Sequence, residues 1–127
     1  MTNEKEKIVL HADDDPTIRL VLGKILKSTF PDAKIEPFED GTSLEKRFLQ
    51  APQADLVVTD NSMPRLTGLD FIQRYSRLVP VPIILVSGDY GIEQKAKEYG
   101  VAAYLQKPFE LKEFVETVRQ ILYPFPR

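Results

Sequence analysis

The sequence predicts an α/β protein with a five-stranded parallel sheet that is doubly wound, with helices on both faces. Five short apolar runs alternate along the chain with five segments whose apolar residues repeat at helical spacing. Strict alternation of this kind is typical of strand–helix–strand units and a parallel sheet. Three of the runs are continuously apolar, as strands buried on both faces are. The length of 127 residues corresponds to about one domain.

The first half of the chain supplies three predicted strands and two predicted helices. The strands cover residues 8–12, 34–38 and 56–59. Pro37 lacks a backbone donor, which places the second strand at an edge of the sheet. Apolar residues at 18, 21, 22, 25 and 26 predict a helix that begins near Pro16. A shorter helix is predicted after Gly41, with Leu44 and Phe48 facing inward.

The second half supplies the remaining two strands and three helices. An apolar stripe predicts a helix over 71–79, in which Phe71 and Tyr75 are core residues. Strands are expected over 83–86 and 102–105, and helices over 92–99 and 111–122. Gly100 is suited to the position that follows a helix C-terminus. The prolines of the tail 123–127 end the last helix, and we expect no output domain after it.

Composition excludes several classes of function. The absence of cysteine excludes disulfides, zinc–thiolate sites and cysteine nucleophiles. A net charge of −2 argues against direct nucleic-acid binding by this chain. The polar N-terminus and short apolar runs predict neither a signal peptide nor a membrane span, so we expect a cytoplasmic protein without membrane partners. The single histidine, His11, is expected to be a half-buried, hydrogen-bonded core residue.

Polar residues follow the predicted strands at the edge where parallel sheets bind ligands. Asp13 and Asp14 follow the first strand, and Asp60 follows the third. Glu39 and Asp40 follow the edge strand, which ends away from the point where the strand order reverses. Three converging carboxylates repel one another unless a hard divalent cation joins them, and Mg²⁺ fits best because it leaves room for waters and phosphate oxygens.

The fourth and fifth strands lead into groups that suit a phosphoryl oxygen. The hydroxyl of Ser87 and the amide of Gly88 are donors, and Lys107 supplies a positive charge. With the three acids, these groups predict phosphoryl transfer, in which a carboxylate oxygen attacks and forms an acyl phosphate. Taken singly, each has a structural interpretation, such as a helix cap for the acids or a surface lysine for Lys107. Their occurrence at one edge of one sheet favours a joint site.

The motifs now identify a family resemblance. They are Asp13-Asp14-Asp15-Pro16, Asp60-Asn61-Ser62-Met63-Pro64, Gly68, Ser87-Gly88, Tyr104 and Lys107-Pro108-Phe109. In this order, and over nearly the whole chain, they resemble the receiver domain of two-component response regulators, of the chemotaxis type. The resemblance implies a flavodoxin-like sheet with strand order 2-1-3-4-5. It also implies a single receiver domain over 1–127, with a core over 7–123.

The resemblance assigns roles to these residues. It implies that Asp60 accepts a phosphoryl group from a sensor histidine kinase or a histidine phosphotransfer protein. Asp14 would bind Mg²⁺ directly and Asp13 partly through water, with Asp60 and the backbone carbonyl of Ser62 completing the ligands. Ser87, Gly88 and Lys107 would bind the phosphoryl oxygens, and Lys107–Pro108 would be cis.

The resemblance further implies a phosphorelay protein rather than an enzyme, limited to self-phosphorylation and slow autodephosphorylation. Ser87 and Tyr104 would form the switch, in which Tyr104 rotates inward from solvent. The fourth helix, fifth strand and fifth helix would then engage a downstream protein or a linked output domain. Two departures are Gly88, where alanine is usual, and His11, where an aliphatic residue is usual.

Two other interpretations remain open from sequence. Asp13-x-Asp15-x-Thr17 matches the first motif of haloacid-dehalogenase-type phosphatases, with Asp13 as nucleophile and Asp15 as acid/base. The chain is short for that fold with a substrate cap, and the motif from Asp60 to Pro64 would have no role. A degenerate receiver that serves only as a binding module is disfavoured because the acids and Lys107 are all present.

Overall fold

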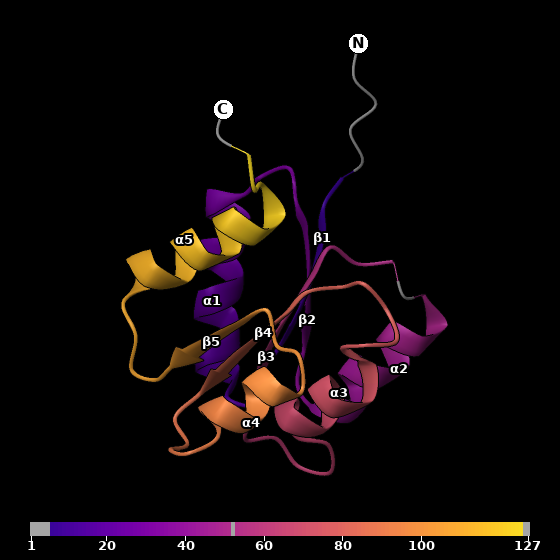
Figure 1. The fold of residues 1–127 in the computed structure, drawn as a ribbon. Helices are drawn as coiled ribbons and strands as arrows, with labels where there is room; N and C mark the ends of the chain where they lie inside the picture. The colour runs from indigo at the N-terminus through magenta and orange to yellow at the C-terminus, as the bar shows by residue number, and fades with distance from the viewer. Residues whose placement is uncertain (1–5, 52, 126–127) are drawn as a thin grey trace.

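A computed structural model describes residues 6–51 and 53–125. Within them, five strands and five helices alternate (Figure 1). The strands are β1 (Ile8–Ala12), β2 (Lys34–Phe38), β3 (Leu56–Asp60), β4 (Ile83–Ser87) and β5 (Ala103–Gln106). The helices are α1 (Pro16–Thr29), α2 (Gly41–Gln50), α3 (Gly68–Tyr75), α4 (Glu93–Glu98) and α5 (Leu111–Leu122). All strand pairs are parallel, in the order β2-β1-β3-β4-β5, which confirms the predicted fold class and strand order.

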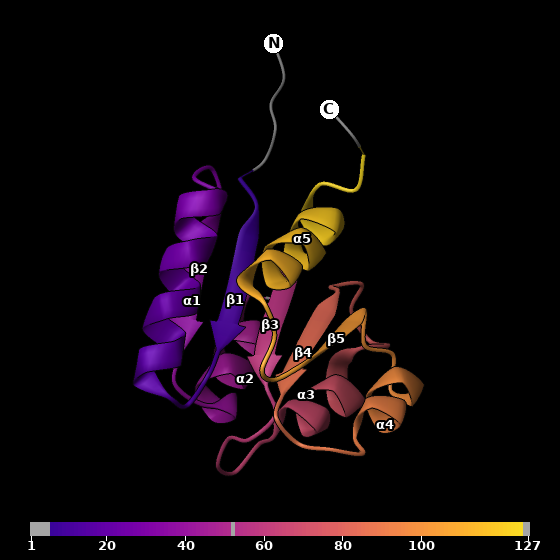
Figure 2. The same ribbon diagram turned by 90° about the vertical axis from the view of Figure 1, so that its left-hand side faces the viewer.

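Two hydrophobic cores lie on opposite faces of the sheet, because successive side chains of a strand point in opposite directions. In β3, Leu56 and Val58 belong to the core under α1 and α5, whereas Val57 belongs to the core under α2, α3 and α4. Figure 2 shows α1 and α5 together on one side of the sheet. Burial of both faces explains why the central strands are continuously apolar.

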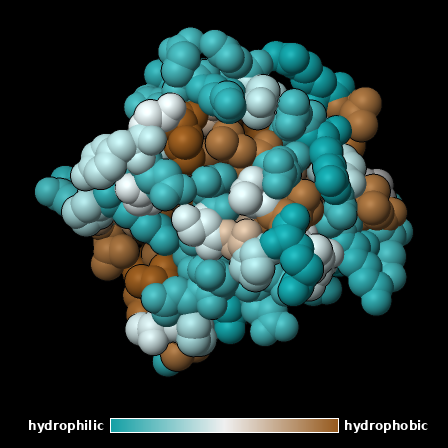
Figure 3. Space-filling model, turned by 90° about the horizontal axis from the view of Figure 1, so that it is seen from below, coloured by the Kyte–Doolittle hydropathy of each residue, from teal (hydrophilic) through white to brown (hydrophobic). Residues whose placement is uncertain are grey.

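The strand register brings the predicted site residues to one edge. Ala12 pairs with Thr59, Asp60 with Val86, and Ser87 with Gln106. The residues that follow β1, β3, β4 and β5 therefore lie side by side, next to the point where the strand order reverses. Figure 3 views the molecule from this end, and its surface there is mostly hydrophilic, with separate hydrophobic patches.

The helix α3 is shorter than the sequence predicted. It ends at Tyr75, and a hydrogen-bonded turn, not a helix, carries the chain to Val79. Leu78 is 76% exposed and therefore not a core residue. The Ser76 hydroxyl donates to the backbone oxygen of Tyr99 at the end of α4, and Pro80 disfavours a helical conformation in the residue before it.

Three local predictions are confirmed. Pro37 lies in the edge strand β2. Gly100 follows α4 with a φ of +98°, a conformation that glycine adopts without strain. The Lys107–Pro108 peptide bond is cis. In the part of the chain that the structure describes, no helix combines the length and apolar character needed to cross a membrane.

Candidate functional site

Three aspartates meet where β1 and β3 end. Asp13, Asp14 and Asp60 each place one carboxylate oxygen within 4.8 Å of the other two. Asp13 and Asp60 are buried, whereas Asp14 is exposed. Two buried carboxylates and one open to solvent form a cluster of hard oxygen ligands that remains accessible from one side.

The turn from β1 into α1 gives the neighbouring acids different tasks. Asp15 is the N-cap of α1 and accepts hydrogen bonds from the backbone of Thr17 and Ile18. Asp13 accepts a 2.9 Å hydrogen bond from the Asp15 amide, and Arg19 donates to the Asp13 carbonyl at 2.7 Å. The helix-cap interpretation therefore holds for Asp15, while Asp13 is fixed at the cluster.

Lys107 reaches the acids from the end of β5. Its Nζ lies 3.5 Å from Asp13 Oδ2 and 3.5 Å from Asp60 Oδ1. Its backbone amide donates to the Ser87 carbonyl at 2.7 Å, and this bond ties the loop after β5 to the end of β4. The side chain thus bridges two carboxylates from separate strands.

The surroundings shift the protonation equilibria of these groups. Burial raises the pKa of Asp13 and of Asp60, although Lys107 acts in the opposite direction on both. Asp60 also accepts a 2.8 Å hydrogen bond from the Asn61 amide, which favours its charged form. Keeping these buried carboxylates ionised therefore costs free energy, and a bound cation would offset that cost.

These residues fit a magnesium ion. Mg²⁺ prefers carboxylate oxygens and keeps several waters, and this cluster offers three carboxylates, one of them exposed. Burial is the main cause of the raised pKa values of Asp13 and Asp60; the charge of Asp14 adds to the rise at Asp13, and the charge of Asp13 adds to the rise at Asp60. Ser62 lies in the exposed loop after β3, and its hydroxyl donates to Asp89 at 3.3 Å.

His11 differs from the prediction. It is 1% exposed, and its Nδ1 is buried without a hydrogen-bond partner in the described part of the chain. Burial, followed by the charges of Arg19 and Lys107, lowers its pKa to about 4. The expectation of a half-buried ring is wrong because His11 points to the same face of the sheet as Val9, and α1 and α5 cover that face.

The loop after β4 does not place the Ser87 hydroxyl on the acids. Ser87 is fully buried, and its Oγ accepts a 2.9 Å hydrogen bond from the Asp89 amide. Gly88 is exposed beside Lys107, and a Cβ added to Gly88 would lie 3.8 Å from the Lys107 Cβ. Alanine, the residue usual in the family, would therefore fit this position without displacement.

The sequence did not predict that Asn61 and Asp89 pair with each other at the mouth of the site. Asn61 donates through Nδ2 to Asp89 at 2.8 Å, and its Oδ1 accepts from the Leu69 amide at 3.0 Å. The Asn61 hydrogen bond lowers the pKa of Asp89. Both residues are polar and lie just after a strand, and this position is the only hint of the pair in the sequence. Sequence alone does not show that their two loops meet.

Tyr104 lies on the same side as this loop. The ring is half-buried against the core under α2, α3 and α4, and its hydroxyl donates to the Asp89 carbonyl at 3.1 Å. Gln106 Oε1 lies 3.0 Å from the same hydroxyl. The ring is therefore already inward in this structure, and the rotation from solvent stays a prediction.

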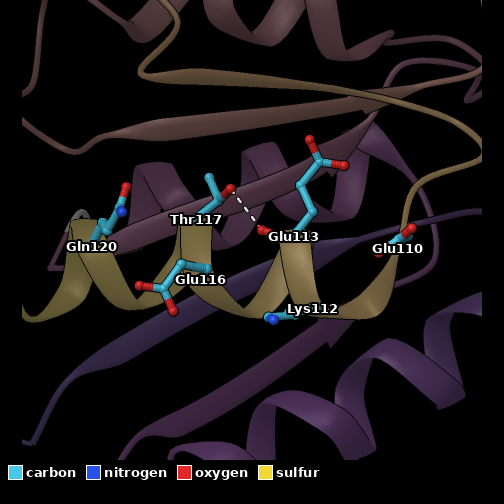
Figure 4. Close-up of a pocket in the computed structure, with 6 residues that line it drawn as sticks. All are labelled: Glu110, Lys112, Glu113, Glu116, Thr117 and Gln120. Atoms are coloured by element: carbon cyan, nitrogen blue, oxygen red, sulfur yellow. Dashed lines mark hydrogen bonds between the residues drawn. The ribbon is translucent and has the colours of Figure 1, made fainter.

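A separate shallow hollow lies along the exposed side of α5. Its volume is about 380 Å³. Its walls are Glu110, Lys112, Glu113, Glu116, Thr117 and Gln120 (Figure 4). The Thr117 hydroxyl donates to the Glu113 carbonyl within the helix. None of the clustered aspartates lines it, so this hollow is distinct from the acid site.

Comparison with known proteins now gives the family. The response regulator receiver domain family matches residues 9–119, and the chain belongs to this family. The DNA-binding transcriptional regulator NtrC of Azospirillum brasilense is 37% identical over 117 residues, which cover 90% of this chain and 24% of that protein. The regulatory protein VirG of Agrobacterium tumefaciens is 31% identical over 126 residues, which cover 96% of this chain and 46% of that protein.

Solved structures agree on the fold. A response regulator receiver protein from Pseudomonas putida has a TM-score of 0.78 and 30% identity, covering 92% of this chain and 98% of that one. The chemotaxis response regulator CheY4 of Vibrio cholerae has a TM-score of 0.79 and 24% identity, covering 93% and 100%. At that identity, the second likeness shows the fold alone.

The chain is thus a receiver domain of two-component signalling, the class in which an aspartate accepts a phosphoryl group. The haloacid-dehalogenase alternative finds no support in these comparisons. The chain spans less than half the length of the curated relatives described above. Other relatives are enzymes as whole proteins, such as the protein-glutamate methylesterase of Chromohalobacter salexigens.

Proposed function

We propose that Asp60 is the phosphoacceptor of this receiver domain. The observation that carries the proposal is the position of Asp60, which ends the central strand β3 within 3.5 Å of the Lys107 ammonium. Asp13 and Asp14 belong to the same cluster. Lys107 lies equally close to Asp13, so what favours Asp60 is its place at the end of the central strand, where it begins the motif Asp60-Asn61-Ser62-Met63-Pro64.

The donor is proposed to be the phosphohistidine of a sensor histidine kinase or a histidine phosphotransfer protein. An Asp60 carboxylate oxygen attacks phosphorus and forms a P–O bond. The P–N bond to the donor imidazole breaks, and the leaving nitrogen takes the electron pair and then a proton. Lys107 neutralises charge on the phosphoryl oxygens, and Gly88 N–H and the Ser87 hydroxyl donate to them once the loop after β4 has adjusted.

Asp13, Asp14, Asp60 and the carbonyl of Ser62 are the proposed Mg²⁺ ligands. When bound, Mg²⁺ would neutralise negative charge on the acids and on the incoming phosphoryl oxygens. Asp13 is held for this task by the Asp15 amide. Asp14 is open to solvent, so it is the ligand that an arriving ion meets first.

The response is proposed to pass through Ser87 and Tyr104 to the surface formed by α4, β5 and α5. Ser87 and Tyr104 both contact Asp89, so movement of Ser87 towards Asp60 changes the support of the Tyr104 hydroxyl. A downstream protein or a linked output domain would bind this surface. We propose that the domain acts in the cytoplasm and turns over no substrate beyond its own phosphoryl group.

Self-phosphorylation tests this function without a cognate kinase. The domain is incubated with acetyl phosphate and Mg²⁺ and followed by intact-mass spectrometry. We expect one added phosphoryl group in the wild type, no adduct with EDTA, and no adduct in Asp60→Asn. Asp14→Asn should slow labelling because it removes the exposed metal ligand.

The matched control is Asp55→Asn, an aspartate outside the cluster whose carboxylate accepts from the Ile8 amide. It should be labelled at the rate of the wild type. Normal labelling of Asp60→Asn, or equal loss of labelling in Asp55→Asn and Asp60→Asn, would refute the assignment.

A further inference from the structure

A second concave site lies between α1 and β2, and neither the clustered aspartates nor any residue of α5 lines it. Figure 2 shows α1 running alongside β2 at this edge of the sheet. The groove has a volume of about 470 Å³. The residues that line it are Pro16, Arg19, Leu20, Gly23, Lys24, Lys27, Ile35 and Pro37. Leu20, on its wall, is 58% exposed, so a large apolar side chain is open to a partner there.

A glycine in the middle of α1 opens the groove. Gly23 is in the helix interior, and a Cβ added to it would meet no atom within 4 Å. Glycine destabilises a helix relative to alanine, and neither packing nor a positive φ requires it at this position. The missing side chain leaves the helix backbone accessible, so another chain can approach α1 closely there.

All the charged residues that line the groove are positive. They are Arg19, Lys24 and Lys27, in a protein whose net charge is −2. Arg19 and Lys27 donate to the backbone carbonyls of Asp13 and Ala33. Within residues 6–51 and 53–125, none of these three cations lies within ion-pair distance of a carboxylate. The groove thus combines an apolar floor with positive charge that no carboxylate neutralises.

We propose that this groove docks an acidic, amphipathic peptide segment of a partner protein. Apolar side chains of the segment would pack on Leu20, Ile35 and Pro37. Its carboxylates would pair with the cations, as charge complementarity at an interface requires. The apolar floor favours a protein segment over a nucleic-acid backbone, whose surface is uniformly charged. The proposal goes beyond phosphorylation at Asp60, and it concerns the β2 edge of the sheet, opposite the β5 edge.

A peptide display experiment tests the proposal. A library of random dodecapeptides is selected on the wild-type domain, and the most enriched peptide is synthesised with a fluorophore. We expect enriched sequences to combine Asp or Glu with Leu, Ile or Phe. Fluorescence anisotropy then compares the wild type with Gly23→Leu, which fills the groove, and with Lys24→Glu, which reverses one charge. Each should weaken binding about tenfold or more.

The control variant is Lys112→Glu, a charge reversal on α5 outside the groove, which should change affinity by less than about twofold. Thermal unfolding of each variant verifies that it is folded, and Gly23→Ala serves as a smaller filling change if Gly23→Leu is not. Three results would each overturn the proposal. The enriched peptides could be neutral or basic, or the peptide could bind Lys24→Glu as tightly as the wild type. Duplex DNA could also bind more tightly than the peptide and displace it completely.

Discussion

Asp40 and Asp60 lie near the carboxyl ends of β2 and β3, the two strands that flank β1, yet their environments are opposite. Asp40 follows the edge strand β2 and caps α2, where it accepts from the Ser43 amide at 2.8 Å and from the Ser43 and Thr42 hydroxyls. These bonds, the Ser43 amide first, lower the pKa of Asp40 to about 2. Burial instead raises the pKa of Asp60.

The difference separates a carboxylate that stabilises the fold from one that is available for chemistry. The charge of Asp40 is satisfied by its own helix and by Arg65 at 3.0 Å. Asp60 accepts one backbone hydrogen bond, and its other interactions are with Lys107 and the like-charged Asp13. An incompletely satisfied carboxylate at a switch point is typical of a functional site, whereas a fully capped one is not.

The largest effect is expected from Lys107→Ala, which removes the ammonium that lies 3.5 Å from Asp60. Its ammonium is the charge that would face the developing phosphoryl oxygens, so the rate of self-phosphorylation should fall about 100-fold. The rate is measured by quenching the reaction with acetyl phosphate at successive times and determining the labelled fraction by intact-mass spectrometry. Arg65→Ala, which removes the cation beside Asp40, should leave the rate unchanged. Equal losses in both variants would mean that the two environments do not differ as described.

Next in size is the loss of stability in Asp40→Ala. Removal of a helix N-cap should lower the free energy of unfolding by about 1–2 kcal/mol. Urea unfolding at neutral pH, with Asp40→Asn as the conservative control that retains a capping oxygen, measures it. A stability equal to that of the wild type would show that the cap of α2 contributes nothing.

Asp60→Asn should act in the opposite direction. The side chain is 7% exposed, and its charged form is disfavoured by burial and by Asp13, so its replacement should raise the free energy of unfolding by about 1 kcal/mol in the presence of EDTA. Mg²⁺ should stabilise the wild type through binding to the folded state and should stabilise this variant less. Destabilisation by Asp60→Asn in EDTA would contradict the electrostatic account.

The smallest effect is a difference in the pH at which Asp40→Ala and Asp60→Asn stop changing the free energy of unfolding. Asp40 has a folded-state pKa of about 2, so its contribution is present above the ordinary value of 3.8 and disappears as the pH falls from there towards 2. Asp60 has a raised folded-state pKa, so its cost is present above that pKa and disappears as the pH falls through it towards 3.8.

Unfolding curves at several pH values should therefore show the Asp60→Asn variant converging on the wild type before Asp40→Ala does. Protonation of His11 on the same acid side affects all three proteins alike and cancels in the comparison. Convergence in the reverse order would mean that one of the two pKa directions is wrong.

Sequence reasoning predicted the fold in most respects because the periodicity of the apolar residues depends on burial, which the sheet imposes on every element. It overextended α3 to residue 79, although Pro80 cannot donate to the Ser76 carbonyl and disfavours a helical conformation at Val79. It expected a half-buried His11 because histidine is usually only partly buried, whereas helices cover the sheet face that His11 shares with Val9.

The candidate site was likewise predictable in part. Strand ends could be read from the sequence, and parallel strands bring their ends together, so the grouping of Asp13, Asp14 and Asp60 was predictable. The conformation of the loop after β4 was not, because the Ser87 hydroxyl has a partner in Asp89 as well as a predicted one in the phosphoryl group. Which of two polar partners a side chain binds depends on the conformation of the loop, and the spacing of residues in the sequence does not reveal that conformation.

The position of the phosphoryl group tests the central claim most directly. The domain is labelled with acetyl phosphate and Mg²⁺, reduced with borohydride to convert the phosphorylated aspartate to homoserine, and digested for peptide mass spectrometry. The account predicts homoserine at position 60 and unmodified aspartate at positions 13 and 14. Homoserine at position 13, the nucleophile of the phosphatase alternative, or label that persists in Asp60→Asn, would contradict it.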